Sequence, residues 1–335
     1  HTAYRRQRQM CIRDRPLSFG IFLIWYVFKD LSEREKNDLY FSFSNANYFW
    51  IFISVVFGIL SHVSRALRWK YSIEPLGKTP RFLNSFFTVM IGYVANLALP
   101  RLGEVTRPGM LAKYEDLPFQ KLFGTIVAER VADLIILALI MTSIVFIEFD
   151  MISDMVLGYL DSGSGSISTS KIVVFSVLVF VGITLLFILM KAKSQNSLLI
   201  KVREFIRGIL EGVQSILKME KKFYFLLHTA FIWIMYIGMF YLCFYSLEET
   251  ADASFGAVLA SFVMGSLAIV FVQGGLGVFP IAVMETLMLY GISKTSALAL
   301  GWILWTSQTI MVIVLGVLSL ILIRVYNKKP NVEVA

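Results

Sequence analysis

The sequence predicts an all-α polytopic membrane protein with about six full spans and two re-entrant helical hairpins in an inverted-repeat arrangement. Hydrophobic residues make up 57% of the 335 residues and charged residues only 16%, whereas about a quarter of a soluble domain is charged. Apolar windows of about 20 residues, the length that crosses ~30 Å of hydrocarbon, recur along the chain. The charges collect between these windows, so they indicate how each window is oriented.

Residues 1–15 do not begin with Met, and they carry five Arg and one Asp of a chain whose formal net charge is +8. The run resembles translated sequencing-adapter DNA, and we expect it to be artefactual rather than native. The basic region of a signal peptide is the alternative, but no small-residue cleavage site follows it. We therefore treat residues 16–335 as a single transmembrane domain.

Cysteine and histidine give no disulfide or metal signal. Beyond residues 1–15 the sequence has Cys243, His62 and His228, which stand far apart. None of them belongs to an HExxH motif or a Cys/His cluster. We expect no cofactor, no metal and no nucleic-acid partner.

The apolar segments define two halves, about 48–148 and about 223–324. A linker and a span (149–193) and an amphipathic helix (197–218) lie between the halves. The helix has its apolar residues at helical spacing, so we expect it to lie on the membrane surface or pack on the bundle. The segments run over 17–28, 48–67, 82–99, 122–147, 172–190, 223–247, 254–272, 278–290 and 296–323.

Lys and Arg indicate orientation, because cytoplasmic loops retain them. Basic residues follow the second segment, fill 191–222 and end the chain, whereas the loops at 148–161 and 248–252 are acidic. We therefore expect a multi-pass protein of the bacterial cytoplasmic (inner) membrane with its C-terminus in the cytoplasm. The basic residues counted as inside after the second segment are Arg65, Arg68, Lys70, Lys78 and Arg81.

Charge parity predicts the first hairpin. Arg81 and Lys121 both lie inside, so the chain between them crosses the membrane an even number of times. The arm 82–99 is apolar, but the arm 103–116 carries charges that lipid does not tolerate. We expect a re-entrant hairpin that turns at residues 99–100, with its polar arm buried in protein or facing a watery cavity.

The second half repeats this pattern upside down. Segments 254–272 and 278–290 form a hairpin from the outside, and 296–323 crosses inward. Residues 101–103 align with 275–277, and the same offset carries Leu117 onto Gly291. Inverted repeats whose broken helices meet near the midplane are typical of transporters.

The turn of the first hairpin predicts an anion site. Pro100 ends the outbound helix, Gly103 permits a reversal, and residues 106–108 (Thr-Arg-Pro) resemble a helix start. A helix start at membrane depth offers unpaired N–H groups and partial positive charge. Arg101 and Arg107 add guanidinium groups suited to phosphate, so we expect an anionic headgroup here.

Charges also enter the next helix. Glu129, Arg130 and Asp133 lie well into the predicted span, and the two carboxylates share one face. Intramembrane charges are candidates for function, but an ion pair with Arg101 or Arg107 that holds the hairpin in place is the alternative. Both roles stay open.

The second turn is rich in glycine. Its residues either let backbone approach a ligand or serve packing alone. An isolated carboxylate follows in the return arm. The headgroup candidates in this half are Gln273, Gly274, Gly275, Gly277 and Glu285.

These motifs resemble the membrane region of lysylphosphatidylglycerol synthases, which also occurs alone in flippase-like integral membrane proteins. The matching residues are Asn96, the run 100–104 (PRLGE) with Arg107, the run 128–130 (AER) with Asp133, and the run 274–277 (GGLG). In the two-part synthases this region is implicated in moving aminoacylated phosphatidylglycerol between leaflets, and a soluble domain makes that lipid. The resemblance implies the stand-alone form without the aminoacyltransferase domain.

We therefore expect a lipid translocase or lipid-binding protein, not an enzyme, that holds an anionic phospholipid, aminoacylated or not. Arg101 and Arg107 would hold the phosphate, and Glu104, Glu129 and Asp133 would balance charge or contact a cationic group. An enzyme that modifies a lipid or a lipid-linked sugar, and a membrane subunit that scaffolds a separate synthase, are the alternatives. The sequence leaves a homo-oligomer open.

Overall fold

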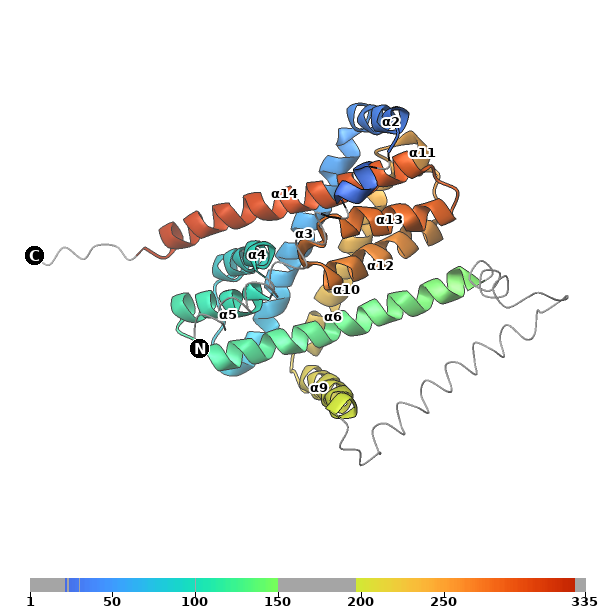
Figure 1. The fold of residues 1–335 in the computed structure, drawn as a ribbon. Coiled ribbons are helices and arrows are strands. Elements are labelled where there is room, and N and C mark those ends of the chain that lie inside the picture. Colours follow the sequence, from blue (N-terminus) through green and yellow to red (C-terminus); the bar gives the residue numbers. More distant parts are fainter. Residues whose placement is uncertain (1–21, 23, 30, 100, 150–196, 329–335) are drawn as a thin grey trace, which may run out of the picture.

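The structure, a computed structural model, describes residues 22, 24–29, 31–99, 101–149 and 197–328, and every regular element in these residues is a helix (Figure 1). The expected all-α class is therefore confirmed for this part of the chain. Residues 1–15, the span 172–190 and half of the span 17–28 lie outside the described residues.

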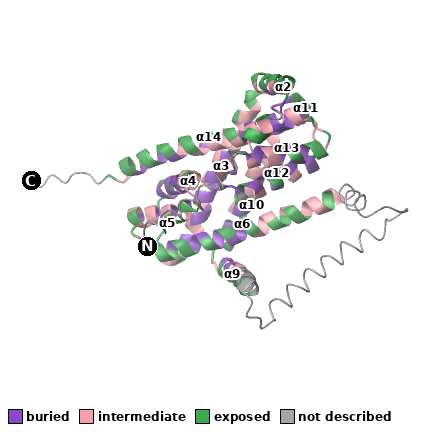
Figure 2. Cartoon of the chain, viewed as in Figure 1, coloured by how far each residue is buried: buried purple, intermediate pink, exposed green. Residues whose placement is uncertain are grey.

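Within the described residues, four helices are long and apolar enough to cross a membrane, and they match four of the expected spans. They are α3 (Tyr48–Ile73), α6 (Phe119–Ile147), α10 (Lys222–Phe244) and α14 (Lys294–Tyr326). Large apolar side chains are exposed along α6 and α14, among them Leu139, Phe146, Ile313 and Ile321 (Figure 2). A surface of this kind suits contact with lipid chains.

Two helical hairpins stand at the expected places. The first joins α4 (Phe82–Ala98) to α5 (Leu102–Glu115), and the second joins α12 (Phe255–Phe271) to α13 (Val278–Leu289) through the short 3-10 turn η2 (Gln273–Gly275). An arm of 17 residues is about 26 Å long at ~1.5 Å per residue, short of a ~30 Å hydrocarbon core. The two arms of each hairpin pack against each other.

The two halves form an inverted repeat. Adding 174 to the first residues of α3, α4, α5 and α6 gives 222, 256, 276 and 293, within two residues of the starts of α10, α12, α13 and α14. In Figure 1, α3 and α10 run in opposite directions, as do α6 and α14. The two halves also pack on each other. Helix α4 of the first half contacts α14 of the second, and α12 of the second half contacts α6 of the first.

Three further helices border this bundle. Helix α2 (Glu33–Ser44) begins with a capping box at Ser32 and Glu35, and α11 (Glu248–Ala251) is a single turn before α12. Helix α9 (Ser197–Leu217) occupies the place of the expected amphipathic helix. It packs against α6, where a Cβ at Gly212 would lie 2.6 Å from Val131 Cγ2.

One expected boundary is wrong. The second apolar segment was expected to end near Leu67 and to release Arg65 and Arg68 into a loop. Instead α3 continues to Ile73, and both arginines are buried within it. The helix extends because acidic side chains of α6 neutralise these charges, as described below.

The first hairpin is held closed by glycine. A Cβ at Gly103 on α5 would lie 2.1 Å from the carbonyl oxygen of Gly92 on α4. The helices therefore approach as closely as backbone allows, as small residues do at interfaces between membrane helices.

We predict that Gly103→Ala opens this hairpin and lowers the free energy of unfolding by about 3 kcal/mol, the upper end of overpacking costs. The matched control is Gly109→Ala on the same helix, whose new methyl would meet only Phe119 at 3.9 Å. Thermal unfolding of the two purified variants in detergent checks this. Equal midpoints for both variants would contradict the proposed packing.

Candidate lipid-headgroup site

Helix α5 begins at Leu102, so the expected helix start at residues 106–108 is wrong. Arg101 precedes it in a left-handed conformation, with φ of 61°. The hydroxyl of Thr106 donates to the carbonyl of Leu102 at 2.8 Å instead of capping a helix, and Pro108 lies inside α5. Proline removes one hydrogen bond to the preceding turn and crowds the carbonyl there, but the helix continues through it here.

The first amides of α5 are already in use. Gly103 N donates to Asn96 Oδ1 at 2.7 Å, and the amides of Leu102 and Glu104 donate to carbonyls within the turn. Asn96 thus ties the end of α4 to the start of α5. These three amides do not supply the unpaired donors that the sequence predicted, so anion binding depends on side chains.

Five buried or nearly buried charges form what we name the charged cluster. Arg107 Nη1 of α5 donates to Glu129 Oε2 of α6 at 2.8 Å, and the Nε atom of Arg68 lies 3.8 Å from Glu129 Oε1. Asp133 accepts from Arg65 Nη1 and Arg68 Nη1, each at 2.8 Å. The members are Arg65, Arg68, Arg107, Glu129 and Asp133.

Arg65 and Arg68 are functional candidates that the sequence prediction missed. They lie three apart on α3, and Glu129 and Asp133 lie four apart on α6; both spacings put the two side chains on one helix face. This same-face spacing was the signal that could have found them. Of the two expected partners for the α6 carboxylates, Arg107 forms the pair, whereas Arg101 is exposed at the turn.

Arg107 keeps free donors. Its guanidinium lies over the ring of Trp69 at 3.8 Å, and Trp69 Nε1 donates to Thr125 Oγ1 at 2.8 Å. Its Nε and Nη2 atoms are buried and have no hydrogen-bond partner among the described residues. These two atoms form one edge of the guanidinium, which can bind two oxygens of a phosphate at once.

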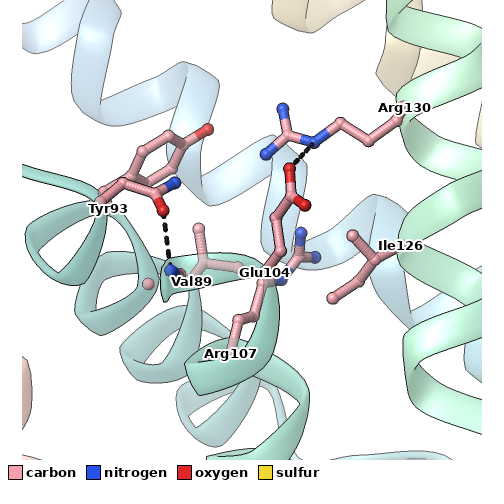
Figure 3. A pocket seen from close by; sticks show the side chains of 9 residues that line it. Val89, Tyr93, Glu104, Arg107, Ile126 and Arg130 are labelled. Carbon is pink, nitrogen blue, oxygen red and sulfur yellow. Dashed lines mark hydrogen bonds and ion pairs between the residues drawn. The ribbon is translucent and has the colours of Figure 1, made fainter. Parts of the chain in front are cut away.

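A small cavity adjoins Arg107. Arg107, Tyr93 and Asn96 line it, and the looser ion pair of Glu104 and Arg130, at 3.9 Å, points across it (Figure 3). Its volume is about 20 Å³, room for about one water molecule. In this conformation the site is therefore closed to a headgroup.

The charges of the site do not balance. The charged cluster holds three guanidiniums and two carboxylates, and the pair of Glu104 and Arg130 is neutral. One positive charge is left over, which matches the single negative charge of a phosphodiester. Within the described residues, no group of three or more His, Cys, Asp or Glu could hold a metal ion.

Comparison with known proteins identifies the family of this chain. The profile of the family described as lysylphosphatidylglycerol synthase TM region matches residues 16–325. The chain belongs to this family. It is a multi-pass membrane protein, and both hairpins and the charged cluster lie inside the match.

One relative is the UPF0104 membrane protein MJ1595 of Methanocaldococcus jannaschii, which is 35% identical over 92 residues. The matched stretch covers 27% of this chain and 27% of that protein. No solved structure matches the chain.

In this member of the synthase TM family, the second hairpin meets the first one tip to tip. Gly274, Gly275 and Gly277 have φ of 66°, 68° and 73°, values that favour glycine. Trp305 Nε1 donates to the carbonyl of Gly274 at 2.6 Å, and a Cβ at Gly274 would lie 3.4 Å from Leu97. These glycines therefore allow a tight turn that touches the end of α4.

The second half does not reproduce the charges. Glu285 is exposed on α13 and forms no ion pair with the charged cluster, and the side chain of Gln273 lies outside the described part of the chain. The 174-residue shift carries the cluster members onto Met239, Leu242, Ile281, Ile303 and Ser307. Among the described residues, the charged cluster is therefore confined to the first half.

We predict that Asp133→Asn lowers the free energy of unfolding by about 3–5 kcal/mol, because it leaves Arg65 and Arg68 buried without their shared carboxylate. Glu285→Gln removes the same charge from an exposed position and serves as the control. Thermal unfolding monitored by size-exclusion chromatography in detergent measures both. Equal unfolding midpoints for the two variants would show that the pairing of Asp133 with Arg65 and Arg68 does not stabilise the fold.

Proposed function

We propose that this protein binds an anionic phospholipid by its phosphodiester at Arg107 and moves it between the leaflets of the membrane. The observation that carries this proposal is the unpartnered Nε–Nη2 edge of Arg107, buried in a cluster with one surplus positive charge. A buried charge without a counter-ion is costly, so the cluster favours binding of a monoanion. Membership of the lysylphosphatidylglycerol synthase TM family supports a lipid as that anion.

Glu129 acts in this proposal as an internal counter-ion. It lies between Arg107 at 2.8 Å and Arg68 at 3.8 Å. When a phosphate approaches Arg107, Glu129 can strengthen its contact with Arg68, so no carboxylate is left unpaired. The half-exposed Glu104 is placed to contact the ammonium group of an aminoacylated headgroup.

Transport requires the closed cavity to open. A headgroup needs far more room than about 20 Å³, so α5 has to move away from α6, and the pair of Glu104 and Arg130 has to separate. The two hairpins meet at Leu97 and Gly274. Movement of one repeat against the other about this contact would expose the cluster to either leaflet in turn.

The proposal includes orientation and partners. We place the protein in the cytoplasmic membrane of a bacterium, with the basic loops and the C-terminus in the cytoplasm, on the distribution of Lys and Arg. We propose transport without covalent chemistry, in which a separate synthase supplies any aminoacylated lipid.

Movement of fluorescent phosphatidylglycerol in proteoliposomes tests the function. We predict that Arg107→Gln lowers the rate at least about tenfold, and that Arg107→Lys does not restore it because an ammonium lacks the two-pronged edge. The control is Lys222→Gln, which removes an exposed charge away from the cluster. Equal rates in folded Arg107→Gln would refute the phosphate site. Consumption of the lipid, seen by mass spectrometry, would favour an enzyme.

A second variant predicts a gain of binding. Glu129→Gln removes the internal counter-ion and raises the surplus of the cluster from one positive charge to two. Phosphatidylglycerol should therefore raise the unfolding midpoint of Glu129→Gln more than that of the wild type, since a ligand stabilises the state it binds. Glu285→Gln should respond as the wild type does. A smaller rise in the unfolding midpoint of Glu129→Gln than of the wild type would show that Glu129 helps to bind the lipid instead of competing with its phosphate for Arg107.

A further inference from the structure

A second, larger cavity is lined in part by Thr125, the hydrogen-bond partner of Trp69. It is bounded by the end of α3 with the 3-10 turn η1 (Glu74–Leu76), the start of α6 and the end of α9, and its volume is about 430 Å³. That volume lies in the range of small-molecule sites, unlike the cavity beside Arg107. The family match and the charged cluster assign no role to it.

The polar side of this cavity is positively charged. Lys121 of α6 and Lys218, which follows α9, both line it, and neither forms an ion pair within the described residues. The nearest carboxylate along η1, Glu74, is already bound to Lys221 at 2.7 Å. Two ammonium groups therefore face one cavity without a carboxylate to neutralise them.

A buried hydroxyl adds a donor. Ser72 lines the cavity and is 4% exposed, and its Oγ atom has no hydrogen-bond partner among the described residues. A buried hydroxyl without a partner is unfavourable, so a ligand oxygen at this position would stabilise it. Two cations and a free hydroxyl donor are suited to a phosphate group.

Much of the remaining wall is apolar. Pro75, Leu76, Ala128 and Met219 line it together with the hydroxyl residues Thr125 and Ser215, and Ser215 belongs to α9, an amphipathic helix. Helices of this type lie at the boundary between headgroups and acyl chains. A cavity with one basic side and one apolar side at such a boundary fits a phospholipid headgroup with its glycerol better than a free anion.

We propose that this cavity binds the headgroup of an anionic phospholipid, as a second site separate from the charged cluster. Helix α6 lines both cavities, and Trp69 connects them. Thr125 lines the large cavity and accepts from Trp69 Nε1 at 2.8 Å, and the guanidinium of Arg107, which lines the small cavity, lies over the Trp69 ring at 3.8 Å. A headgroup held here lies one aromatic residue away from the closed site.

Filling the cavity tests the proposal. A Cβ at Gly124 would meet no atom within 4 Å, so Gly124→Leu projects a side chain into the open cavity without a clash, and it also favours the helix. Gly208→Leu on α9 also meets no atom within 4 Å and does not line the cavity, so it is the matched control. Native mass spectrometry of the full chain titrated with phosphatidylglycerol counts the bound lipids.

We predict that Gly124→Leu, and separately Lys121→Gln with Lys218→Gln, weaken one phosphatidylglycerol site about tenfold or more, whereas Gly208→Leu and Lys222→Gln change it less than twofold. Arg107→Gln should retain phosphatidylglycerol binding in the large cavity. Loss of this binding and loss of transport are therefore separate outcomes. Unchanged lipid binding in Gly124→Leu would overturn the proposal. Displacement of the lipid by millimolar inorganic phosphate alone would show a soluble anion as the occupant, and would also overturn it.

Discussion

Five charged side chains packed between three helices set the constraint on which the first half of this protein depends. Glu129 lies ten residues into α6, about 15 Å along the helix from Phe119. At that depth an unpaired charge costs several kcal/mol, so each carboxylate needs arginines, and each arginine needs a neighbouring carboxylate or ring. Arg68 on α3 and Arg107 on α5 both pair with Glu129 on α6. These pairs fix how α3, α5 and α6 face one another.

The hairpin follows from the same constraint. Helix α5 can carry Arg107 to Glu129 only if it packs deep against α4, and this needs the glycines at positions 92 and 103. Asn96 then binds the amide of Gly103 and closes the turn. The second hairpin has an outbound arm of the same length, α12, but carries the apolar Ile281 at the position equivalent to Arg107, so it completes the scaffold without a second charged cluster in the described residues.

Sequence reasoning found much of this arrangement and failed at identifiable points. Parity of charge placed both hairpins, and the spacing of Glu129 and Asp133 indicated a common face. Arg65 and Arg68 were assigned to a loop, because counting basic residues cannot distinguish a cytoplasmic charge from one paired inside the bundle. The start of α5 was placed too late because Thr106 and Pro108 resemble a helix start, whereas the reversal occurs at Arg101.

The sequence by itself determined the membrane class, the order of the long and short helices, and the repeat, because hydropathy and glycine or proline breaks act locally along the chain. The tertiary structure decided which charges pair, since pairing depends on how neighbouring helices are rotated about their axes. It also decided that the site beside Arg107 is closed and that Lys121 and Lys218 line a larger basic cavity. Both features arise where three helices meet, so no single segment of the sequence can indicate them.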